Sequence, residues 1–307
     1  MKTIKNFCAL CAISMALTAC EKPILDSEDI TPTGNVTLTF TATNSDATIR
    51  AAHVTAGSPA GVTRSATTNL AMYFQKLNVM LFDAWGEKAF STVKTQTADD
   101  SGFGSLTCQL QEGTYTVVAV GHSSIKSATI KSPQMVQFTA SDGEKLTDTF
   151  CYCGEIEVGN EELQYTFQMQ RVCAMVQFKL TDETVPESFT KMVIAYTGGS
   201  ANFNPTTSEG TTKSTQSENR QRSDTSTYQV FTFPYMADTG SLKMTLTAYD
   251  ADGNTLRQRV FESVPVTRNR ITTYQGQFFD GTEGNFTQST FGFSVNGEWS
   301  GEDNYDF

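Results

Sequence analysis

Few residues in this chain have the type and spacing that catalysis or metal binding requires. His53 and His122 are its only histidines, so the sequence holds neither an HExxH zinc motif nor a histidine-rich metal site. A Ser-His-Asp triad would have to use one of them, and His122 follows the apolar run 118–121, where a hydrogen-bonding structural histidine is expected. The GxSxG elbow, the P-loop and the dinucleotide fingerprint are also missing. We therefore expect no enzyme, no cofactor and no metal.

Residues 250–254, Asp-Ala-Asp-Gly-Asn, resemble the start of a calcium loop. The glycine falls at the fourth position instead of the sixth, and the twelfth position is Phe261 instead of a bidentate glutamate. An Asp-Gly turn between two strands explains the segment better. Carboxylates are plentiful, and a glycosidase-type pair stays open at this level.

The clearest chemistry belongs to Cys20. A short basic head precedes an apolar run over residues 7–17 that is too short for a permanent membrane helix, and residues 17–20 read Leu-Thr-Ala-Cys. Small residues before a cysteine match the bacterial lipobox, where signal peptidase II cuts before the cysteine and its thiol is diacylated, for example with palmitate. The alternative is an ordinary secretory cut at the same bond. We expect a signal peptide at 1–19 and lipidation of Cys20.

Four cysteines, Cys108, Cys151, Cys153 and Cys173, remain in the expected mature fold. Export permits disulfides, and four cysteines allow three pairings. Cys108 alternates with two leucines, where a small buried hydrophobe fits. Cys151 and Cys153 do not have the CxxC spacing of redox or zinc sites. The disulfide state is left open.

Composition indicates an all-β protein, and net charge limits its partners. A chain of 307 residues suits two domains, and 21 Phe with 11% aromatics favour strands over helices. The formal net charge of −11 argues against nucleic acid as a partner. We therefore expect the protein to attach to the membrane through its lipid and not through a basic patch.

Residues 163–180 suggest how the two domains divide. Apolar residues alternate from 163 to 169 and again from 172 to 180, but on opposite parity. One continuous strand could not bury both sets in one core without a bulge, so we predict two strands, the last of one sandwich and the first of the next. We expect a linker over 20–34, an N-terminal sandwich over 35–170 and a C-terminal sandwich over 171–307.

Alternating patterns predict the other strands. Those of the first domain lie near residues 36–40, 77–82, 106–110, 115–120, 135–138 and 148–152, with 106–110 and 115–120 forming a hairpin. Those of the second lie near 192–196, 228–233, 242–249 and 256–261. Residues 44–69 and 198–227 lack an apolar period. The first is expected to be a long loop, and the second a long exposed loop or a poorly ordered one. A turn signature shared by residues 82–86 and 249–253 suggests a duplicated sandwich.

Several short motifs fall in one order along most of the chain. They include LNVMLFD at 77–83, EGTY at 112–115, GHS at 121–123, RVCAM at 171–175, YTGGS at 196–200, TFP at 232–234 and RNRITTYQG at 268–276. Together they resemble the FimB-type fimbrial anchor and minor subunits of Bacteroidota, within the fimbrillin superfamily of type V pili. The similarity runs from about the lipobox to Phe279.

The resemblance implies two tandem transthyretin-like β-sandwich domains after a lipoprotein signal peptide, and a lipid-anchored place in the outer membrane and fimbrium. It implies partners among the fimbrial pilins, joined by β-strand exchange, and carries over no catalytic residue. In stalk pilins of the superfamily an Arg-specific protease removes the first strand, whereas anchors are expected to keep theirs. Arg50 and Arg64 are candidate protease sites in this chain.

Residues 286–299 contain the candidate donor strand, with Phe291, Phe293 and Val295 entering a neighbour's groove at every second position. The alternative is that this segment is the domain's own last strand. Two functions follow. One is a structural subunit, the outer-membrane anchor or an accessory component. The other is a surface adhesin lipoprotein that binds a glycan or a host or bacterial surface protein through loops such as 198–227.

Overall fold

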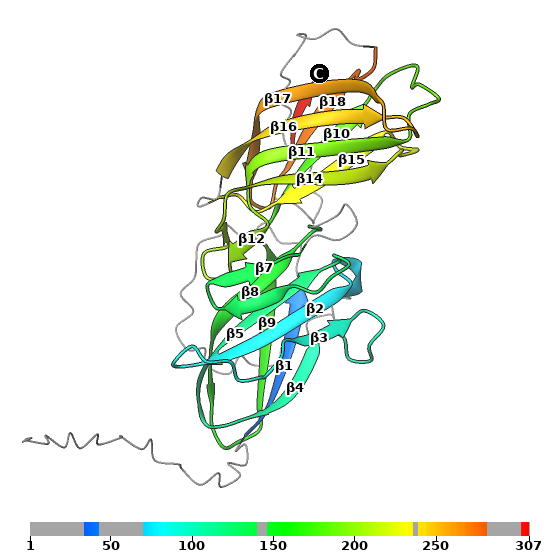
Figure 1. Cartoon of the computed structure of the whole chain (residues 1–307). Coiled ribbons are helices and arrows are strands. Elements are labelled where there is room, and N and C mark those ends of the chain that lie inside the picture. The colour runs from blue at the N-terminus through cyan, green and yellow to red at the C-terminus, as the bar shows by residue number, and fades with distance from the viewer. Residues whose placement is uncertain (1–33, 43–69, 140–145, 236–238, 281–301, 307) are drawn as a thin grey trace, which may run out of the picture. The chain divides into compact units, whose positions relative to one another are not determined.

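The structure is a computed structural model that describes residues 34–42, 70–139, 146–235, 239–280 and 302–306 (Figure 1). Within these ranges nineteen strands, β1 to β19, make up nearly all of the regular structure, and the single short helix is the 3₁₀ turn η1 (Leu70–Met72). The all-β prediction is confirmed. No helix in the same ranges is long and apolar enough to cross a membrane.

The first half of the chain forms a seven-stranded sheet with the order β3-β2-β5-β8-β9-β1-β4. Its strands are β1 (Gly34–Ala42), β2 (Lys76–Asp83), β3 (Lys94–Thr97), β4 (Ser105–Leu110), β5 (Gly113–His122), β8 (Phe150–Val158) and β9 (Leu163–Arg171). In β2 six consecutive residues are buried, because Leu77, Val79 and Leu81 face one apolar core and Met80 and Phe82 face another.

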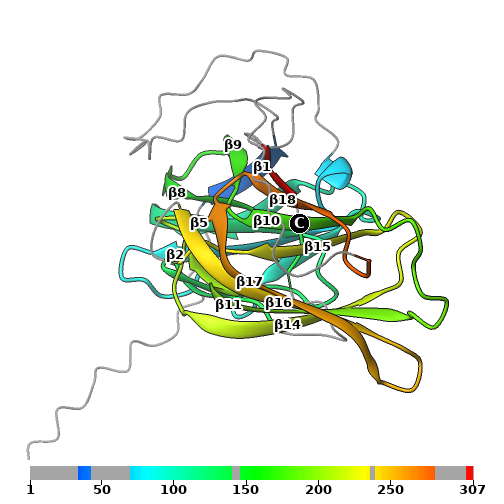
Figure 2. The same cartoon turned by 90° about the horizontal axis from the view of Figure 1, so that it is seen from above.

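The second half forms two four-stranded sheets, with the orders β15-β10-β18-β19 and β14-β11-β16-β17. Figure 2 shows β14, β11, β16 and β17 side by side. The strands are β10 (Ala174–Leu180), β11 (Lys191–Gly199), β14 (Ser214–Gln221), β15 (Thr227–Thr232), β16 (Thr239–Tyr249), β17 (Thr255–Thr267), β18 (Ile271–Gly276) and β19 (Glu302–Asp306). Both sheets contribute to one core, in which Phe178, Ile194 and Leu246 are fully buried.

One strand-pairing pattern occurs in both halves. β1 pairs antiparallel with β4 and parallel with β9, and β10 pairs in the same way with β15 and β18. The order β3-β2-β5-β8 likewise corresponds to β14-β11-β16-β17. The two similar turns do not mark this repeat, because one joins β2 to β3 and the other joins β16 to β17, which are positions that do not correspond.

The expectation of a long exposed loop over residues 198–227 is wrong. This stretch holds β12 (Asn202–Asn204), β13 (Glu209–Gly210) and β14, and β12 pairs with β7 (Met135–Gln137), which pairs with β6 (Thr129–Ser132). Phe203 is fully buried in a third apolar cluster, 4.6 Å from the ring of Phe233. One phenylalanine among polar residues leaves no apolar period, so the sequence pattern did not reveal its burial.

The predicted hairpin of residues 106–110 and 115–120 is also wrong in its pairing. Both segments are strands, but β4 pairs with β1, and β5 pairs with β2 and β8. Alternation identifies a strand and its buried face, whereas the partner is set by tertiary packing. The predicted hairpin at residues 250–254 does form, between β16 and β17.

Residues 163–180 form two strands, as the change of parity predicted. β9 ends at Arg171 in the seven-stranded sheet, and β10 begins at Ala174 in a different sheet. Phe167 and Met169 lie in the first core, and Val176 and Phe178 lie in the second. The third apolar cluster takes side chains from both sides of this point, so the domain limits themselves stay a prediction.

Candidate functional site

The first strand after the expected linker is held on both edges. β1 lies between β9 and β4 and pairs with each of them. The Phe40 amide donates to the Gly104 carbonyl at 2.8 Å, and the Thr41 hydroxyl donates to the Phe167 carbonyl at 3.1 Å. Removing β1 would therefore leave unpaired backbone groups on two strands at once.

The side chains of β1 fill the first core. Val36, Leu38, Phe40 and Ala42 are at most 2% exposed, while the intervening threonines face outward, as a period of two requires. The ring of Phe40 lies 5.6 Å from that of Phe167. Burial of side chains such as Val, Leu and Phe stabilises a fold by roughly 1.5–3 kcal/mol each. β1 is thus both a sheet strand and a main part of the core.

Gly34 marks the place where the chain enters the sheet. A Cβ atom at this position would lie 2.4 Å from the Gly159 carbonyl oxygen, in the turn between β8 and β9. Only glycine permits this close approach of two backbone segments. The linker from Cys20 therefore meets the fold beside the β8–β9 turn.

A second strand-pairing site lies at the edge of β18. β19 pairs with it in parallel, from Ile271 opposite Glu302 to Gln275 opposite Asp306. The Tyr305 ring stacks on Tyr274 with centroids 4.7 Å apart. Burial, and then the charge of the neighbouring Tyr305, raises the pKa of Tyr274. A C-terminal segment thus adds one strand to a sheet edge by main-chain pairing and one aromatic anchor.

The corresponding edge in the first half is closed differently. There β8 pairs with β9 only at Phe150–Arg171 and Cys151–Gln170. Farther along, Tyr152 of β8 stacks on Phe167 of β9 with centroids 4.3 Å apart. In the first half a tyrosine ring thus contacts β9 beyond the two paired positions, whereas in the second half β19 pairs with β18 over five positions.

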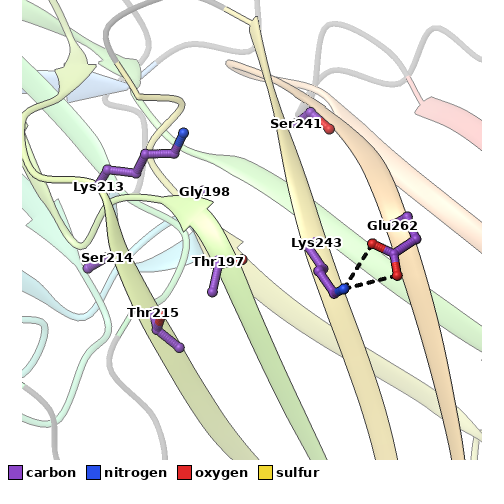
Figure 3. Close-up of a pocket in the computed structure, with 8 residues that line it drawn as sticks. All are labelled: Thr197, Gly198, Lys213, Ser214, Thr215, Ser241, Lys243 and Glu262. Carbon is purple, nitrogen blue, oxygen red and sulfur yellow. Dashed lines mark hydrogen bonds and ion pairs between the residues drawn. The ribbon is translucent and has the colours of Figure 1, made fainter.

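A shallow, open hollow lies on the outer face of β11, β14, β16 and β17 (Figure 3). Its lining is polar: Thr197, Gly198, Lys213, Ser214, Thr215, Ser241, Lys243 and Glu262. The Lys243 ammonium pairs with the Glu262 carboxylate at 2.9 Å, and the Lys213 ammonium lies 6.0 Å from the Tyr235 ring. Hydroxyl and ammonium donors of this kind can hydrogen-bond a polar ligand such as a sugar, but they form no nucleophile–base pair.

His122 is a structural residue. It is fully buried, its Nδ1 accepts from the Ser124 amide at 3.1 Å, and its Nε2 lies 2.8 Å from Asn78 Oδ1. Because Nδ1 is an acceptor, Nε2 carries the proton and donates it to Asn78. Burial, and then the charge of Lys76, lowers the pKa of His122 to about 3. With both nitrogens engaged and the ring neutral, His122 has no lone pair free for general-base catalysis.

The described residues hold no group of three or more His, Cys, Asp or Glu arranged to bind a metal ion. The four cysteines of the fold are free thiols. Burial raises the pKa of each, that of Cys151 and Cys173 well above the usual value, so the thiolate form that attacks substrates or binds metals is disfavoured.

Comparison with known families identifies the chain. A family model described as a family of unknown function, DUF6562, matches residues 30–307. This protein belongs to the DUF6562 family. The matched region contains every strand of the structure.

Solved structures overlap with the DUF6562 chain at low similarity. A candidate adhesin from Bacteroides ovatus has 12% identity and a TM-score of 0.46, with 76% of this chain and 84% of the other covered. The fimbrial anchor protein Mfa2 from Porphyromonas gingivalis has 14% identity and a TM-score of 0.38, with coverage of 74% and 81%. A fimbrial assembly protein from Parabacteroides distasonis has 12% identity and a TM-score of 0.38, with 79% of this chain and 90% of the other covered. At TM-scores below 0.5, the family assignment rests on the DUF6562 match alone. No curated protein matches the chain.

The sequence-predicted site residues of this DUF6562 member lie outside the described ranges. These are Cys20, Arg50, Arg64, Phe291, Phe293 and Val295, and His53 lies outside them as well. Their roles stay predictions. The predicted first strand at 36–40 is present as β1.

The sequence pattern did not predict several features of the DUF6562 fold. β19 is a polar segment, Glu-Asp-Asn-Tyr-Asp, in which Tyr305 was the only apolar signal. On the edge strand β14 the buried Glu218 accepts from the Tyr196 hydroxyl at 3.0 Å and pairs with Arg220. An inward-facing carboxylate cannot be recognised from a polar run, because the Tyr196 hydroxyl that it accepts from lies on another strand, β11.

Proposed function

We propose that this protein is a non-enzymatic structural subunit of cell-surface fimbriae. It is held in the outer membrane by lipid on Cys20, acts as the anchor or an accessory subunit, and joins other subunits by β-strand complementation. The lipobox at 17–20 and the ordered motifs that resemble FimB-type subunits support this role.

The observation that carries the proposal is the position of β1. The chain that leaves Cys20 enters the fold at Gly34 and becomes at once a core strand paired on both edges. Tension on the membrane tether is therefore carried by the hydrogen bonds and buried side chains of β1. Cleavage at Arg50 or Arg64 would cut the covalent path between that strand and the rest of the fold. An anchor that cuts its own tether is self-defeating, so the uncut form fits this role.

Strand complementation has two candidate segments at the C-terminal end. β19 lies along β18, and Phe291, Phe293 and Val295 precede it in the chain. In the proposal, residues 286–299 carry the donor strand, and β19 completes the edge of its own sheet. The donor side chains enter the neighbour's groove at alternate positions.

The two segments can be tested separately by co-purification of pilin with the membrane-held protein. Replacing Phe291, Phe293 and Val295 by Asp should abolish co-purification, because charged side chains are not tolerated in an apolar groove. Tyr305→Asp is the matched variant for β19 and should leave co-purification intact. Unchanged pilin recovery with the triple variant would remove the donor strand from the mechanism.

A second candidate function is that of an adhesin, favoured by the polar hollow near Thr197 and Lys213. In this function the hollow binds a glycan or a host surface protein. Immunogold labelling separates the two candidates: label at the fibre base supports the anchor, and label at the distal end supports the adhesin. Lys213→Ala with Thr215→Ala should reduce glycan-array binding only if the hollow is the ligand site.

A further inference from the structure

Trp85 is the most exposed of the large apolar side chains that the structure describes, at 87%. It lies in the turn that joins β2 to β3. Tryptophan combines a large apolar ring with one N–H donor, so it is enriched at interfaces where one end of the ring is apolar and the other is hydrated.

The turn itself does not require a tryptophan. In residues 83–87 the Asp83 amide donates to the Glu87 carbonyl at 2.9 Å, the Glu87 amide donates to Asp83 Oδ1 at 2.8 Å, and Gly86 has a φ of +82°. Residues 250–254 repeat this geometry, with distances of 3.1 and 2.7 Å between Asp250 and Asn254 and a φ of +86° at the glycine. Asp252 takes the place of Trp85 there, so the ring has a role other than forming the turn.

Strand registers place Trp85 at the end of the sheet where the chain enters from Cys20. Asp83 is opposite Tyr115 on β5, and Gly113, two residues before Tyr115, is opposite Val158 on β8. A Cβ on Gly34 would lie 3.4 Å from the Val158 side chain. Trp85, two residues beyond Asp83, therefore lies at the same end of the sheet as Gly34.

We propose that the Trp85 ring enters the headgroup region of the bilayer that holds the Cys20 lipid, and so fixes the orientation of the first sheet on the membrane. This inference rests on the proposed lipid anchor. Residues 20–33 can span at most about 50 Å, which is ample for the turn to touch the surface. Because the lipid already tethers the chain, ring insertion is an intramolecular step that needs little intrinsic affinity.

The charges near Trp85 define the kind of surface. Glu112 lies in the β4–β5 turn and Glu161 and Glu162 lie in the β8–β9 turn, all exposed at this same end. Beside Trp85, Glu87 and Lys88 are both exposed. A mainly acidic end repels anionic headgroups, so the partner is a neutral, zwitterionic lipid surface.

The test uses the full mature lipoprotein with Trp299→Phe, which leaves Trp85 as the sole tryptophan of the two in the chain. The protein is reconstituted in phosphatidylcholine vesicles with brominated acyl chains. The bromolipid should quench Trp85 fluorescence, and the vesicles should lower acrylamide quenching about two-fold relative to the Cys20→Ala protein. Trp85 fluorescence unaffected by bromolipid, in protein that floats with the vesicles, would overturn the proposal.

Controls separate this inference from the anchor itself. Protein that does not float with vesicles indicates failure of the Cys20 anchor and of the inference with it, whereas floating without quenching contradicts Trp85 insertion alone. Ile125 is 58% exposed at the opposite end of β5, so Ile125→Trp combined with Trp85→Asp and Trp299→Phe should show no bromolipid quenching. Equal quenching at both positions would show adsorption that does not depend on this end of the sheet. Stronger quenching when phosphatidylglycerol is added would contradict the neutral lipid surface.

Discussion

Arg171 Nε and Nη2 donate to the two carboxylate oxygens of Asp148, at 2.7 and 2.8 Å. The guanidinium is buried, lies 4.6 Å from the centre of the Phe150 ring, and donates through Nη1 to Asn269 Oδ1 at 3.0 Å. Asn269 lies between β17 and β18, and its backbone amide donates to the Cys173 carbonyl at 2.8 Å. One buried arginine thus links the end of β9 with a turn of the second half.

Removing one partner of this pair should be costly. Asp148→Asn leaves the buried Arg171 charge without its carboxylate and should lower the free energy of unfolding by about 3 kcal/mol. The exposed pair Lys243–Glu262 is the control, and Lys243→Met should change the free energy by at most about 1 kcal/mol. Guanidinium chloride unfolding measures both, and equal effects of the two variants would show that burial does not strengthen the Arg171 pair.

His122 should make the fold sensitive to mild acid. The unfolded chain takes up a proton on this residue below its ordinary pKa of 6.5, but the folded chain does so only near the lowered pKa of about 3. Stability is therefore lost as the pH falls from 6.5 toward 3, and His122 accounts for about 2 kcal/mol of the loss between pH 7 and pH 5. His122→Gln should flatten the pH profile of unfolding over this range. Parallel profiles for the two proteins would contradict the buried, neutral imidazole.

Phe203 should behave as a core residue despite its polar surroundings. It is fully buried against Phe233, so Phe203→Ala should cost about 3–5 kcal/mol in unfolding free energy. Thr225→Ala, an exposed change in the same polar stretch, should stay within about 0.5 kcal/mol. A Phe203→Ala effect as small as that of the threonine would support the exposed loop that the sequence pattern favoured.

The two faces of β1 offer a matched comparison. Leu38 is fully buried, and Leu38→Ala should cost about 2–5 kcal/mol. Its neighbour Thr39 faces outward, and Thr39→Ala should cost at most about 1 kcal/mol. Thermal unfolding of the two variants tests the register of β1, since a shift by one residue would reverse their order.

Much of the strand content followed from alternation, because a half-buried strand leaves a period of two in its own sequence. Val36, Leu38 and Phe40 identified β1, and the change of parity near Arg171 separated β9 from β10. Pairing did not follow, because β4 and β5 are adjacent in sequence and yet lie far apart in the sheet order. Strand partners depend on contacts that local patterns do not record.

The candidate site was less accessible to sequence reasoning. The sequence shows Trp85 only as a turn residue. Its exposure depends on the folded structure, and its position at the Gly34 end of the sheet follows from the strand registers. Glu218 and Arg171 look like ordinary surface charges in the sequence, but both are buried, and Tyr196 and Asp148, their hydrogen-bond partners, come from distant parts of the chain. Tyr305 anchors a polar strand through one ring contact, which no periodicity would reveal.

In the proposed role, the protein joins a fibre to the membrane through an uncut chain from Cys20 into β1. Mass spectrometry of the mature protein recovered from membranes with sheared fibres tests it most directly. We expect an acylated Cys20 peptide, peptides that run intact across Arg50 and Arg64, and pilin in the same fraction. A mature N-terminus at Ala51 or Ser65, or fibres that carry none of this protein, would contradict it.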